Sequence, residues 1–261
     1  MSSDLRVSAA RSFESGADAY ELYRPPYPGR MFDDIVEAAG DLWGGPLLEI
    51  GAGTGRATVE LARRGASIEV VEPSQDMVDV LTRRLHDADV AESISVRQGV
   101  FEDVSPDESF PLAVAAQSFH WADPATRWSR LAQILGTRGR AFLFWNAWNL
   151  DPAHHDLPAI TAVYGEHGPE LPIGLPRDYV ARMWADGEIE RDPHVALVDR
   201  RSYEWSHSMS RDAYLGLLET ISQYAIAPRE ERDALYGALA PLLGDVVHLQ
   251  GATLMLVVAR A

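Results

Sequence analysis

Three glycines at alternate positions, Gly51, Gly53 and Gly55, follow the apolar run that ends at Ile50. Glycine adopts positive φ at little cost and leaves no side chain between a turn and a ligand. A strand that ends in such a turn and leads into a helical pattern can hold a small molecule directly on its peptide groups. The stretch 47–58 therefore predicts a binding loop for a nucleotide-like ligand.

The residues beside the glycines argue against a ligand held by its phosphates. The dinucleotide fingerprint G-x-G-x-x-G has its third glycine where this chain has Arg56. A phosphate-binding P-loop needs a lysine after its glycines, and the chain contains no lysine. Both phosphate interpretations are weakened.

Two acidic residues indicate the chemistry of the ligand instead. Glu49 lies two residues before the first glycine, where a fixed negative charge repels a pyrophosphate but suits an ammonium or a sulfonium. Glu72 closes the next predicted strand, about 20 residues after the first glycine, where a carboxylate can accept both hydroxyls of a ribose. A ligand with a cationic amino-acid end and an adenosine end is S-adenosylmethionine, which we predict as the cofactor.

Four motifs in order along the chain resemble those of the class I S-adenosylmethionine-dependent methyltransferases. The resemblance is to the small-molecule branch, which includes methyltransferase type 11 and trans-aconitate methyltransferase-like proteins, and it spans roughly the whole chain. The motifs are Ala-Asp-Ala-Tyr-Glu-Leu-Tyr-Arg-Pro-Pro-Tyr-Pro at 17–28, Glu-x-Gly-x-Gly-x-Gly at 49–55 with Glu72, Ala-Gln-Ser-Phe-His-Trp at 116–121 and Leu-Phe-Trp-Asn at 143–146. Four ordered motifs are far more specific than one glycine run.

This resemblance implies an α/β fold with a Rossmann-like seven-stranded methyltransferase sheet. The sheet is expected to be mostly parallel, with an antiparallel last strand between strands five and six and with helices on both faces. The hydrophobic patterns predict strands at 47–50, 68–72, 94–97, 112–116, 141–145, about 195–208 and 253–259. Helices are expected at about 29–39, 56–64, 211–225 and 229–242, after Ser74, from Asp123 with Pro124 at its first position, and around 177–185.

We expect a single methyltransferase domain over 1–261. Its parts are an N-terminal lid segment at 1–28, a cofactor-binding core at 29–150, an acceptor-facing insertion at 151–194 and a C-terminal part at 195–261 that completes the sheet. The amphipathic stretch 11–24 places Phe13, Ala17 and Tyr20 on one helical face before two prolines. The resemblance implies that this segment closes over cofactor and acceptor.

The composition excludes several enzyme classes. Without cysteine or lysine, the chain has no thiolate metal ligand, cysteine nucleophile or Schiff-base lysine. Its 39 acidic residues against 23 arginines give a net charge of −16, which disfavours nucleic acid as a partner. The sequence has no apolar signal core and no apolar run of about 20 residues. We expect a cytoplasmic protein that acts on a small molecule without a membrane partner.

The predicted cofactor residues follow from the glycine loop, the ends of the next strands and the resemblance. They are Glu49, Gly51, Ala52, Gly53, Thr54, Gly55, Glu72, Pro73, Met77, Phe101, Glu102 and Gln117. In the family an acidic side chain accepts from the adenine amino group, and Val100 stands at its usual position here. Glu102, Asp103 and backbone groups around Phe101 are therefore the alternatives for that contact.

The predicted acceptor pocket gathers side chains from the lid segment and from the ends of two strands. Its members are Tyr20, Tyr23, Arg24, Trp121, Trp145, Asn146 and Trp148. Because the sulfonium methyl is already electrophilic, the protein need only hold a nucleophile in line with it for an SN2 displacement, and no metal is expected. A carboxylate acceptor needs no base, whereas a hydroxyl would want one, and His120 is the best-placed catalytic candidate. O-methylation of a carboxylate or hydroxyl is favoured.

Two other functions share these motifs. A protein of this fold can use the bound cofactor to promote a rearrangement without methyl transfer, or can bind it without any chemistry. The dense aromatic rim favours an acceptor cavity over the second alternative. A nicotinamide oxidoreductase is disfavoured by Arg56 and Glu49.

The adjacent His154 and His155 cannot both face one metal from a regular element, so we expect solvated side chains there.

Overall fold

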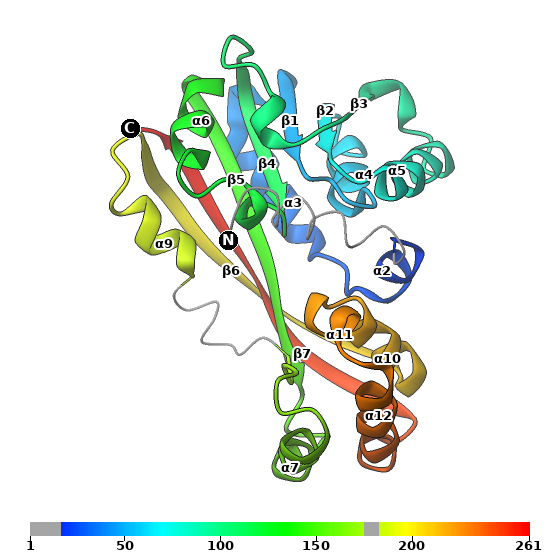
Figure 1. The fold of residues 1–261 in the computed structure, drawn as a ribbon. Coiled ribbons are helices and arrows are strands. Elements are labelled where there is room, and N and C mark those ends of the chain that lie inside the picture. Colours follow the sequence, from blue (N-terminus) through cyan, green and yellow to red (C-terminus); the bar gives the residue numbers. More distant parts are fainter. Residues whose placement is uncertain (1–16, 175–182) are drawn as a thin grey trace.

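The computed structural model describes residues 17–174 and 183–261. At its centre is a seven-stranded sheet in the order β3-β2-β1-β4-β5-β7-β6 (Figure 1). The strands are β1 (Pro46–Ile50), β2 (Ser67–Glu72), β3 (Ile94–Gln98), β4 (Phe110–Ala116), β5 (Leu135–Leu150), β6 (Val195–Ser210) and β7 (Val246–Arg260). The first five strands pair in parallel, and β7 is antiparallel to both β5 and β6. The predicted sheet, with strand seven between five and six, is confirmed.

Helices cover both faces of this sheet. They are α2 (Ala17–Tyr23), α3 (Gly29–Ala39), α4 (Arg56–Ala62), α5 (Gln75–Asp87), α6 (Arg127–Ile134), α7 (Leu157–His167), α9 (Trp184–Ile189), α10 (Arg211–Glu219), α11 (Ser222–Ile226) and α12 (Arg229–Leu243). Side chains of α3, α4 and α5 share one hydrophobic core with the sheet, and those of α6 and α9 share the core on the opposite face. The sheet thus has the two covering layers typical of a doubly wound α/β fold.

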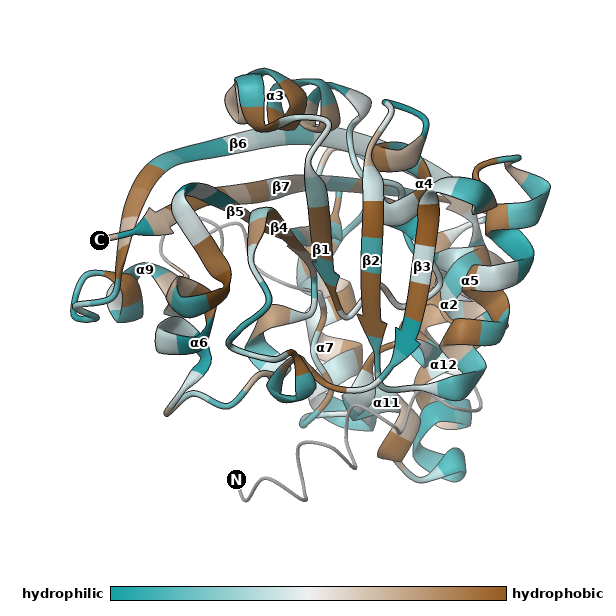
Figure 2. Ribbon diagram, turned by 90° about the horizontal axis from the view of Figure 1, so that it is seen from above, coloured by the Kyte–Doolittle hydropathy of each residue, from teal (hydrophilic) through white to brown (hydrophobic). Residues whose placement is uncertain are grey.

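Alternation along the strands explains the two cores. In β1, Leu47 packs in the core with α3 and α4, while Leu48 packs in the core with α6, because successive side chains of a strand point to opposite faces. Figure 2 shows long hydrophobic stretches along β1 and β2, as expected for central parallel strands buried on both faces. The middle of the outer strand β6 is mostly hydrophilic in the same view.

A third hydrophobic core lies where β5, β6 and β7 extend beyond the other strands. The helices α7, α10, α11 and α12 gather around this end of the three long strands (Figure 1). Two buried tyrosines from different helices, Tyr164 and Tyr224, share a hydrogen bond between their hydroxyls at 2.7 Å inside it. This core brings the C-terminal helices next to α2, which contacts α10.

The lengths of two strands differ from the prediction. The predicted fifth strand, 141–145, is only the middle of β5, so that Asn146 and Trp148 lie within the strand rather than just past it. The reason is β7, which pairs residue by residue with β5 from Ala141 to Leu150 and keeps the chain extended. For the same reason β7 begins at Val246, seven residues before the predicted start at Thr253.

Two predicted helices also differ. The helix expected to begin at Asp123 begins at Arg127, because Asp123 and Pro124 lie in a turn in which Asp123 Oδ1 accepts from the backbone N–H of Ala125. The helix expected at 211–225 is broken into α10 and α11, and the Thr220 hydroxyl donates to the carbonyl of Leu217 where α10 ends. The expected helix at 177–185 and the part of the lid before Ala17 fall largely outside the described residues.

None of the helices described in 17–174 and 183–261 has the length and apolar character needed to cross a bilayer.

One buried ion pair fastens α9 to the core. The guanidinium of Arg127, only 5% exposed, contacts both carboxylate oxygens of Glu188 and lies over the ring of Trp184 at 4.2 Å. Trp128 Nε1 donates to Glu188 as well, at 2.8 Å. Removal of Glu188 would leave a buried guanidinium and an indole N–H without this partner.

We expect Glu188→Ala to lower the free energy of unfolding by about 1–3 kcal/mol, because breaking one side of a buried charged pair leaves the other uncompensated. Urea denaturation measures the loss. The matched control is Glu190→Ala, an exposed glutamate on the same short segment, which should change stability by no more than about 0.5 kcal/mol. Equal losses in the two variants would show that the Arg127 ion pair contributes nothing.

Candidate functional site

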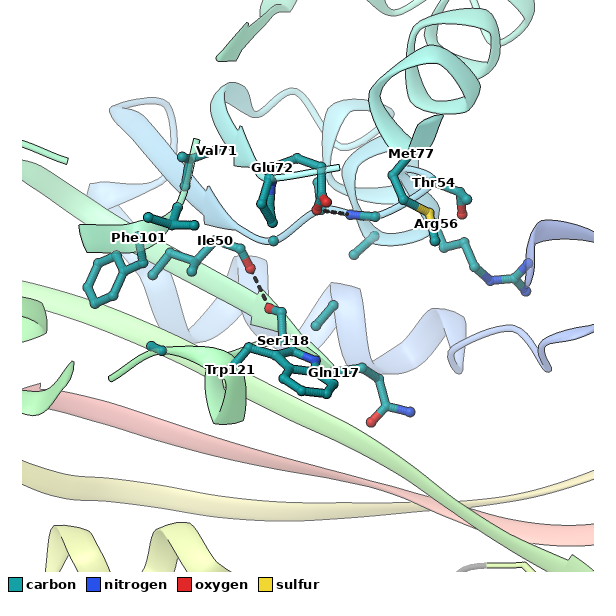
Figure 3. Close-up of a pocket in the computed structure, with 18 of the residues that line it drawn as sticks. Ile50, Thr54, Arg56, Val71, Glu72, Met77, Phe101, Gln117, Ser118 and Trp121 are labelled. Atoms are coloured by element: carbon teal, nitrogen blue, oxygen red, sulfur yellow. Dashed lines mark hydrogen bonds between the residues drawn. The ribbon is translucent and has the colours of Figure 1, made fainter. Parts of the chain in front are cut away.

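A cavity of about 340 Å³ opens at the carboxyl ends of β1, β2 and β4. This is the edge where open α/β sheets bind ligands. Figure 3 shows the side chains that surround it, with Glu72 and Met77 on one side and Ser118 and Trp121 on the other. Every predicted cofactor residue except Glu49 and Gly55 lines this cavity.

The three glycines of the loop all have positive φ, and two of them are also required by close packing. At Gly51 an added Cβ would lie 2.6 Å from Cβ of Ser118, and at Gly55 it would lie 2.3 Å from Leu81 Cδ1. At Gly53 an added Cβ would meet nothing within 4 Å. Gly51 and Gly55 thus permit close packing, while Gly53 is required for its backbone conformation alone.

The end of β4 forms the opposite wall of the cavity. Ser118 Oγ donates to the carbonyl of Ile50 and so ties this wall to the end of β1 (Figure 3). Gln117 has a φ of 60°, which is uncommon for a residue other than glycine, and its backbone N–H donates to the carbonyl of Phe144 at 2.9 Å. Sequence reasoning predicted Gln117 and missed Ser118, whose contact with Gly51 depends on the pairing of two distant strands.

Glu72 is held by backbone donors on both of its carboxylate oxygens. Its Oε2 accepts from the N–H of Gly53 at 2.8 Å, and its Oε1 accepts from the N–H of Ser74 at 3.0 Å. Burial raises the pKa of Glu72, and the two N–H donors act in the opposite direction. Each oxygen has a second lone pair, so this carboxylate can also accept hydrogen bonds from a ligand in the cavity that it lines.

Glu49 is fully buried in β1, directly before the glycine loop, and does not line the cavity. Burial raises the pKa of Glu49 to about 7, the nearby Thr58 hydroxyl lowers it and the charge of Glu72 raises it further. Within the described parts of the chain, neither carboxylate oxygen of Glu49 has a partner in hydrogen-bonding geometry, and neither does the Thr58 hydroxyl. A buried acid without a counter-charge favours a cationic group nearby.

The three candidates for an adenine contact lie in different positions relative to the cavity. Glu102 lines the cavity, and its Oε1 accepts from the backbone N–H of Asp123 at 2.7 Å. Asp103 instead turns back on its own loop, where its Oδ2 accepts from the N–H of Val100 at 3.0 Å. The ring of Phe101 is buried and forms part of the cavity wall.

The helix α2 is fastened to the glycine loop by a charged cluster. Glu21 accepts hydrogen bonds from Thr54 Oγ1 at 2.7 Å and from Arg84 Nη1 at 2.5 Å. Arg56 donates to the carbonyls of Glu21 and Arg24, both at 2.7 Å. Sequence reasoning missed Glu21 and used Arg56 only as an argument against a pyrophosphate, although its place beside the loop was a usable signal.

Arg24, which directly follows α2, fastens the same end of the helix to the C-terminal helices. Arg24 Nε donates to Thr220 Oγ1 and Arg24 Nη2 donates to the Thr220 carbonyl, both at 2.8 Å. Its guanidinium also lies over the ring of Tyr20 at 5.0 Å. The helix therefore joins the glycine loop to the end of α10.

A small recess of about 10 Å³ lies next to the large cavity and shares four lining residues with it. Such a volume holds about one water molecule. The residues that line the recess are Tyr20, Arg24, Pro25, Tyr27, Arg56, Gln117, Asn146 and Trp148. The structure thus brings together Tyr20, Arg24, Asn146 and Trp148 of the predicted acceptor pocket, while Trp121 lines the large cavity. Tyr27, which lines both spaces, was missed although it belongs to the motif at 17–28.

Two members of the predicted acceptor pocket lie elsewhere. Tyr23 packs on α10, where a Cβ added to Gly216 would come within 2.4 Å of its ring. Trp145 is buried in the core on the α6 side and contacts the ring of Trp184 edge-on at 5.7 Å between ring centroids. Its neighbour Asn146 points to the opposite face because the strand continues through this region.

His120 does not line either space. Its ring lies 4.8 Å from the ring of Trp121, keeps an exposed edge and accepts a 3.4 Å hydrogen bond at Nδ1 from Trp145 Nε1. Although the residue as a whole is exposed, partial desolvation of the ring by these groups lowers the pKa of His120, and the charge of Arg127 adds to the shift. The ring is therefore neutral near pH 7, and the bond to Nδ1 leaves its proton on Nε2.

Across 17–174 and 183–261, no group of three or more histidine and acidic side chains is arranged to hold a metal ion. His154 is exposed, as expected, and stacks on His248 at 4.1 Å. The expectation of a solvated side chain is wrong for His155, which is buried because its Nε2 accepts from the backbone N–H of His248 at 2.9 Å.

Comparison with known proteins agrees with this geometry. The model of the methyltransferase domain family matches residues 47–139. An uncharacterized methyltransferase of Mycobacterium tuberculosis is 28% identical over 244 residues, which are 91% of this chain and 88% of the relative. An uncharacterized methyltransferase-like protein of Schizosaccharomyces pombe is 22% identical over 241 residues, which are 92% and 89% of the two chains.

Residues 47–139 thus match a methyltransferase domain, and the chain is similar to methyltransferases over about nine-tenths of its length. Solved structures agree with the fold. A proposed type II methyltransferase from Anaeromyxobacter dehalogenans has a TM-score of 0.64 at 20% identity and covers 91% of this chain and 98% of its own. A methyltransferase from Geobacter sulfurreducens, solved with S-adenosylhomocysteine, has a TM-score of 0.51 at 16% identity and covers 94% and 97%.

We expect Gly51→Ala to disrupt the glycine loop, because its Cβ would collide with Ser118 in addition to straining a positive φ. The matched control is Gly65→Ala, which has a φ of 88° but nothing within 4 Å of the added Cβ. Both variants should lose about 1 kcal/mol from the backbone, and Gly51→Ala a further 1–3 kcal/mol or so from overpacking. Urea denaturation measures both. If the two losses were the same, the contact with Ser118 would not constrain the loop.

A second prediction concerns the pH dependence of stability. The folded pKa of Glu49, about 7, is above its usual value of 4.5, so the native state binds more protons than the unfolded state between these pH values. Its contribution to stability is therefore complete below about pH 4.5 and is lost as the pH rises through 7. Glu49→Gln should remove this loss, which makes the variant gain stability relative to the native protein across that window. A pH-independent difference in unfolding free energy between the two proteins would contradict this assignment.

Proposed function

We propose that this methyltransferase transfers the methyl group of S-adenosylmethionine to an oxygen of a small-molecule acceptor that carries a carboxylate. One observation carries the proposal. The large cavity runs from the glycine loop and Glu72 to an aromatic rim, and there it adjoins a recess lined by hydrogen-bond donors. The two spaces together suit an adenosine-bearing cofactor and a small oxygen-rich acceptor.

The residues of the cavity fit the cofactor at each of its chemical parts. Glu72 is placed to accept from ribose hydroxyls, Glu102 has a second oxygen for the adenine amino group, and Met77 and Phe101 supply apolar walls. Glu49 lies outside the cavity lining, directly before the glycine loop, and its orphaned carboxylate favours a ligand with a cationic amino-acid end. When bound, the cofactor supplies an electrophilic methyl group on a sulfonium.

The acceptor end favours a carboxylate. Of the described residues that line the recess, none is acidic, and two are the arginines Arg24 and Arg56. Although the chain has a net charge of −16, this corner presents positive charge and amide groups to a ligand. A carboxylate is already a nucleophile at neutral pH and needs no base to remove a proton. The aromatic rings of Tyr20 and Trp121 exclude water from the reacting atoms and offer π faces to a cation.

A base role for His120 stays a prediction and applies to a hydroxyl acceptor. Its neutral ring at pH 7 is compatible with proton acceptance, but its Nδ1 already accepts from Trp145.

We also propose that α2 acts as the lid, since it closes one side of both spaces through Tyr20, and that 1–261 is one domain. That the insertion at 151–194 faces the acceptor stays a prediction as well.

The first test is calorimetric titration of the full chain with S-adenosylmethionine and S-adenosylhomocysteine, with NAD as control. We expect micromolar binding of the first two and at least a tenfold weaker affinity in Glu72→Ala, since the variant loses both the ribose partner and the bond to Gly53. Glu69→Ala on the same strand is the matched control, because Glu69 pairs with Arg97 and does not line the cavity.

The second test is a screen of small carboxylic acids, alcohols and amines with S-adenosylmethionine, in which mass spectrometry detects the methylated product. We expect methyl esters from the carboxylic acids. Binding without any methylated product would favour a cofactor-binding protein, an isomerised acceptor with intact cofactor would identify a rearrangement, and no binding at all would overturn the proposal.

A further inference from the structure

Asn146 and Thr253 form a hydrogen-bonded pair at the back of the recess. They lie opposite each other on the neighbouring strands β5 and β7, and both side chains are buried, with residue exposures of 5% and 0%. Thr253 Oγ1 donates to Asn146 Oδ1 at 2.5 Å. Thr253 was absent from the predicted site, because only the strand pairing places it behind Asn146.

This bond decides which end of the amide faces the recess. With Oδ1 turned toward Thr253, the Nδ2 group of Asn146 is left for the recess that the residue lines. No hydrogen bond from Nδ2 to any residue of 17–174 or 183–261 is formed. A buried amide with two N–H donors in a polar recess favours a ligand that brings an acceptor oxygen.

The size and lining of the recess agree with a single oxygen atom. Its volume of about 10 Å³ suits one water-sized group and excludes a ring or a branched chain. Arg24 and Arg56 both line it, and each guanidinium has protein partners that hold it in place. The recess therefore holds one oxygen and has basic and amide side chains in its lining.

We propose that Thr253 is a positioning residue that holds the Asn146 amide with its Nδ2 group toward the recess, where it can only donate hydrogen bonds. The recess therefore selects acceptors that present a carboxylate or carbonyl oxygen to Nδ2. The inference rests on the proposed function, since it assigns this oxygen to the methyl acceptor. A buried donor left unpaired discriminates strongly against analogues that lack the matching oxygen. Amines, which would place N–H groups against Nδ2, are rejected for the same reason.

The direct test is NMR of the Asn146 side-chain amide in the full ¹⁵N-labelled chain, assigned by its loss in Asn146→Asp. Acetate is the probe for a carboxylate, and ethylammonium is the probe for an amine. Acetate should shift the Nδ2 signals and ethylammonium should not. The shift should be lost in Thr253→Val and restored in Thr253→Ser, which keeps the hydroxyl. The control is Tyr203→Phe: Tyr203 lies opposite Thr253 on the next strand, and the variant loses only its hydroxyl bond to Asp34 of α3, so the shift should persist.

Kinetics with an acceptor from the screen provide the second readout. Thr253→Val should raise KM for the acceptor about tenfold, the equivalent of one lost hydrogen bond, with kcat and the affinity for S-adenosylhomocysteine changed by less than about twofold. A merely structural role would instead raise KM and lower both kcat and the affinity for S-adenosylhomocysteine. A lower melting temperature in Thr253→Val would not by itself account for a selective change in KM.

The outcomes separate this inference from the proposed function. If S-adenosylhomocysteine binds but acetate leaves the Asn146 amide unchanged, the oxygen subsite is wrong and the methyltransferase proposal stands. If acetate shifts the amide while the cofactor does not bind, the subsite stands and the proposed reaction fails. A shift with ethylammonium instead of acetate would show that the amide faces the other way, with Oδ1 in the recess, and would overturn the inference.

Discussion

The close approach of Gly51 to Ser118 is the constraint on which the rest of the site depends. No side chain fits between these two residues, so the glycine loop and the end of β4 converge at the floor of the cavity. The Ser118 hydroxyl then holds the two strand ends together through the carbonyl of Ile50. Glu72 fixes the next turn of the loop through Gly53. A ligand in the cavity therefore meets peptide groups whose positions are set before it arrives, which reduces the cost of ordering them.

The distribution of charge divides the site into two chemically different ends. Around the glycine loop the carboxylates of Glu49, Glu72 and Glu102 are buried or line the cavity, whereas the recess is lined by arginine and amide side chains and by no acidic residue of the described chain. A surface with a strong negative excess repels a small anion at long range, but within about 8 Å local charges dominate at physiological salt. The net charge of −16 is therefore compatible with the carboxylate acceptor proposed for the recess.

Local signals allowed much of the fold and the cofactor end to be predicted. The glycines from 51 to 55 and the acid at Glu72 depend on turn chemistry and on strand ends, and both can be recognised in a single sequence. Trp145 and Tyr23 were placed in the acceptor pocket, yet the structure puts neither in its lining, because β7 extends the fifth strand and α10 accepts the tyrosine ring. Ser118 and Thr253 act through strands far apart in the sequence, so no local pattern identifies them. The acceptor end is built by such distant pairings.

The two attachments of α2 have a consequence for the energetics of the whole chain. The C-terminal end of this short helix is bonded to the glycine loop through Glu21 and Arg56, and to the end of α10 through Arg24. Displacement of the helix would break both sets of bonds at once, so local opening at the cavity and loosening of the C-terminal helices are parts of one cooperative unit. A ligand that favours the docked helix therefore also protects the backbone around Thr220, on the far side of the helix from the glycine loop.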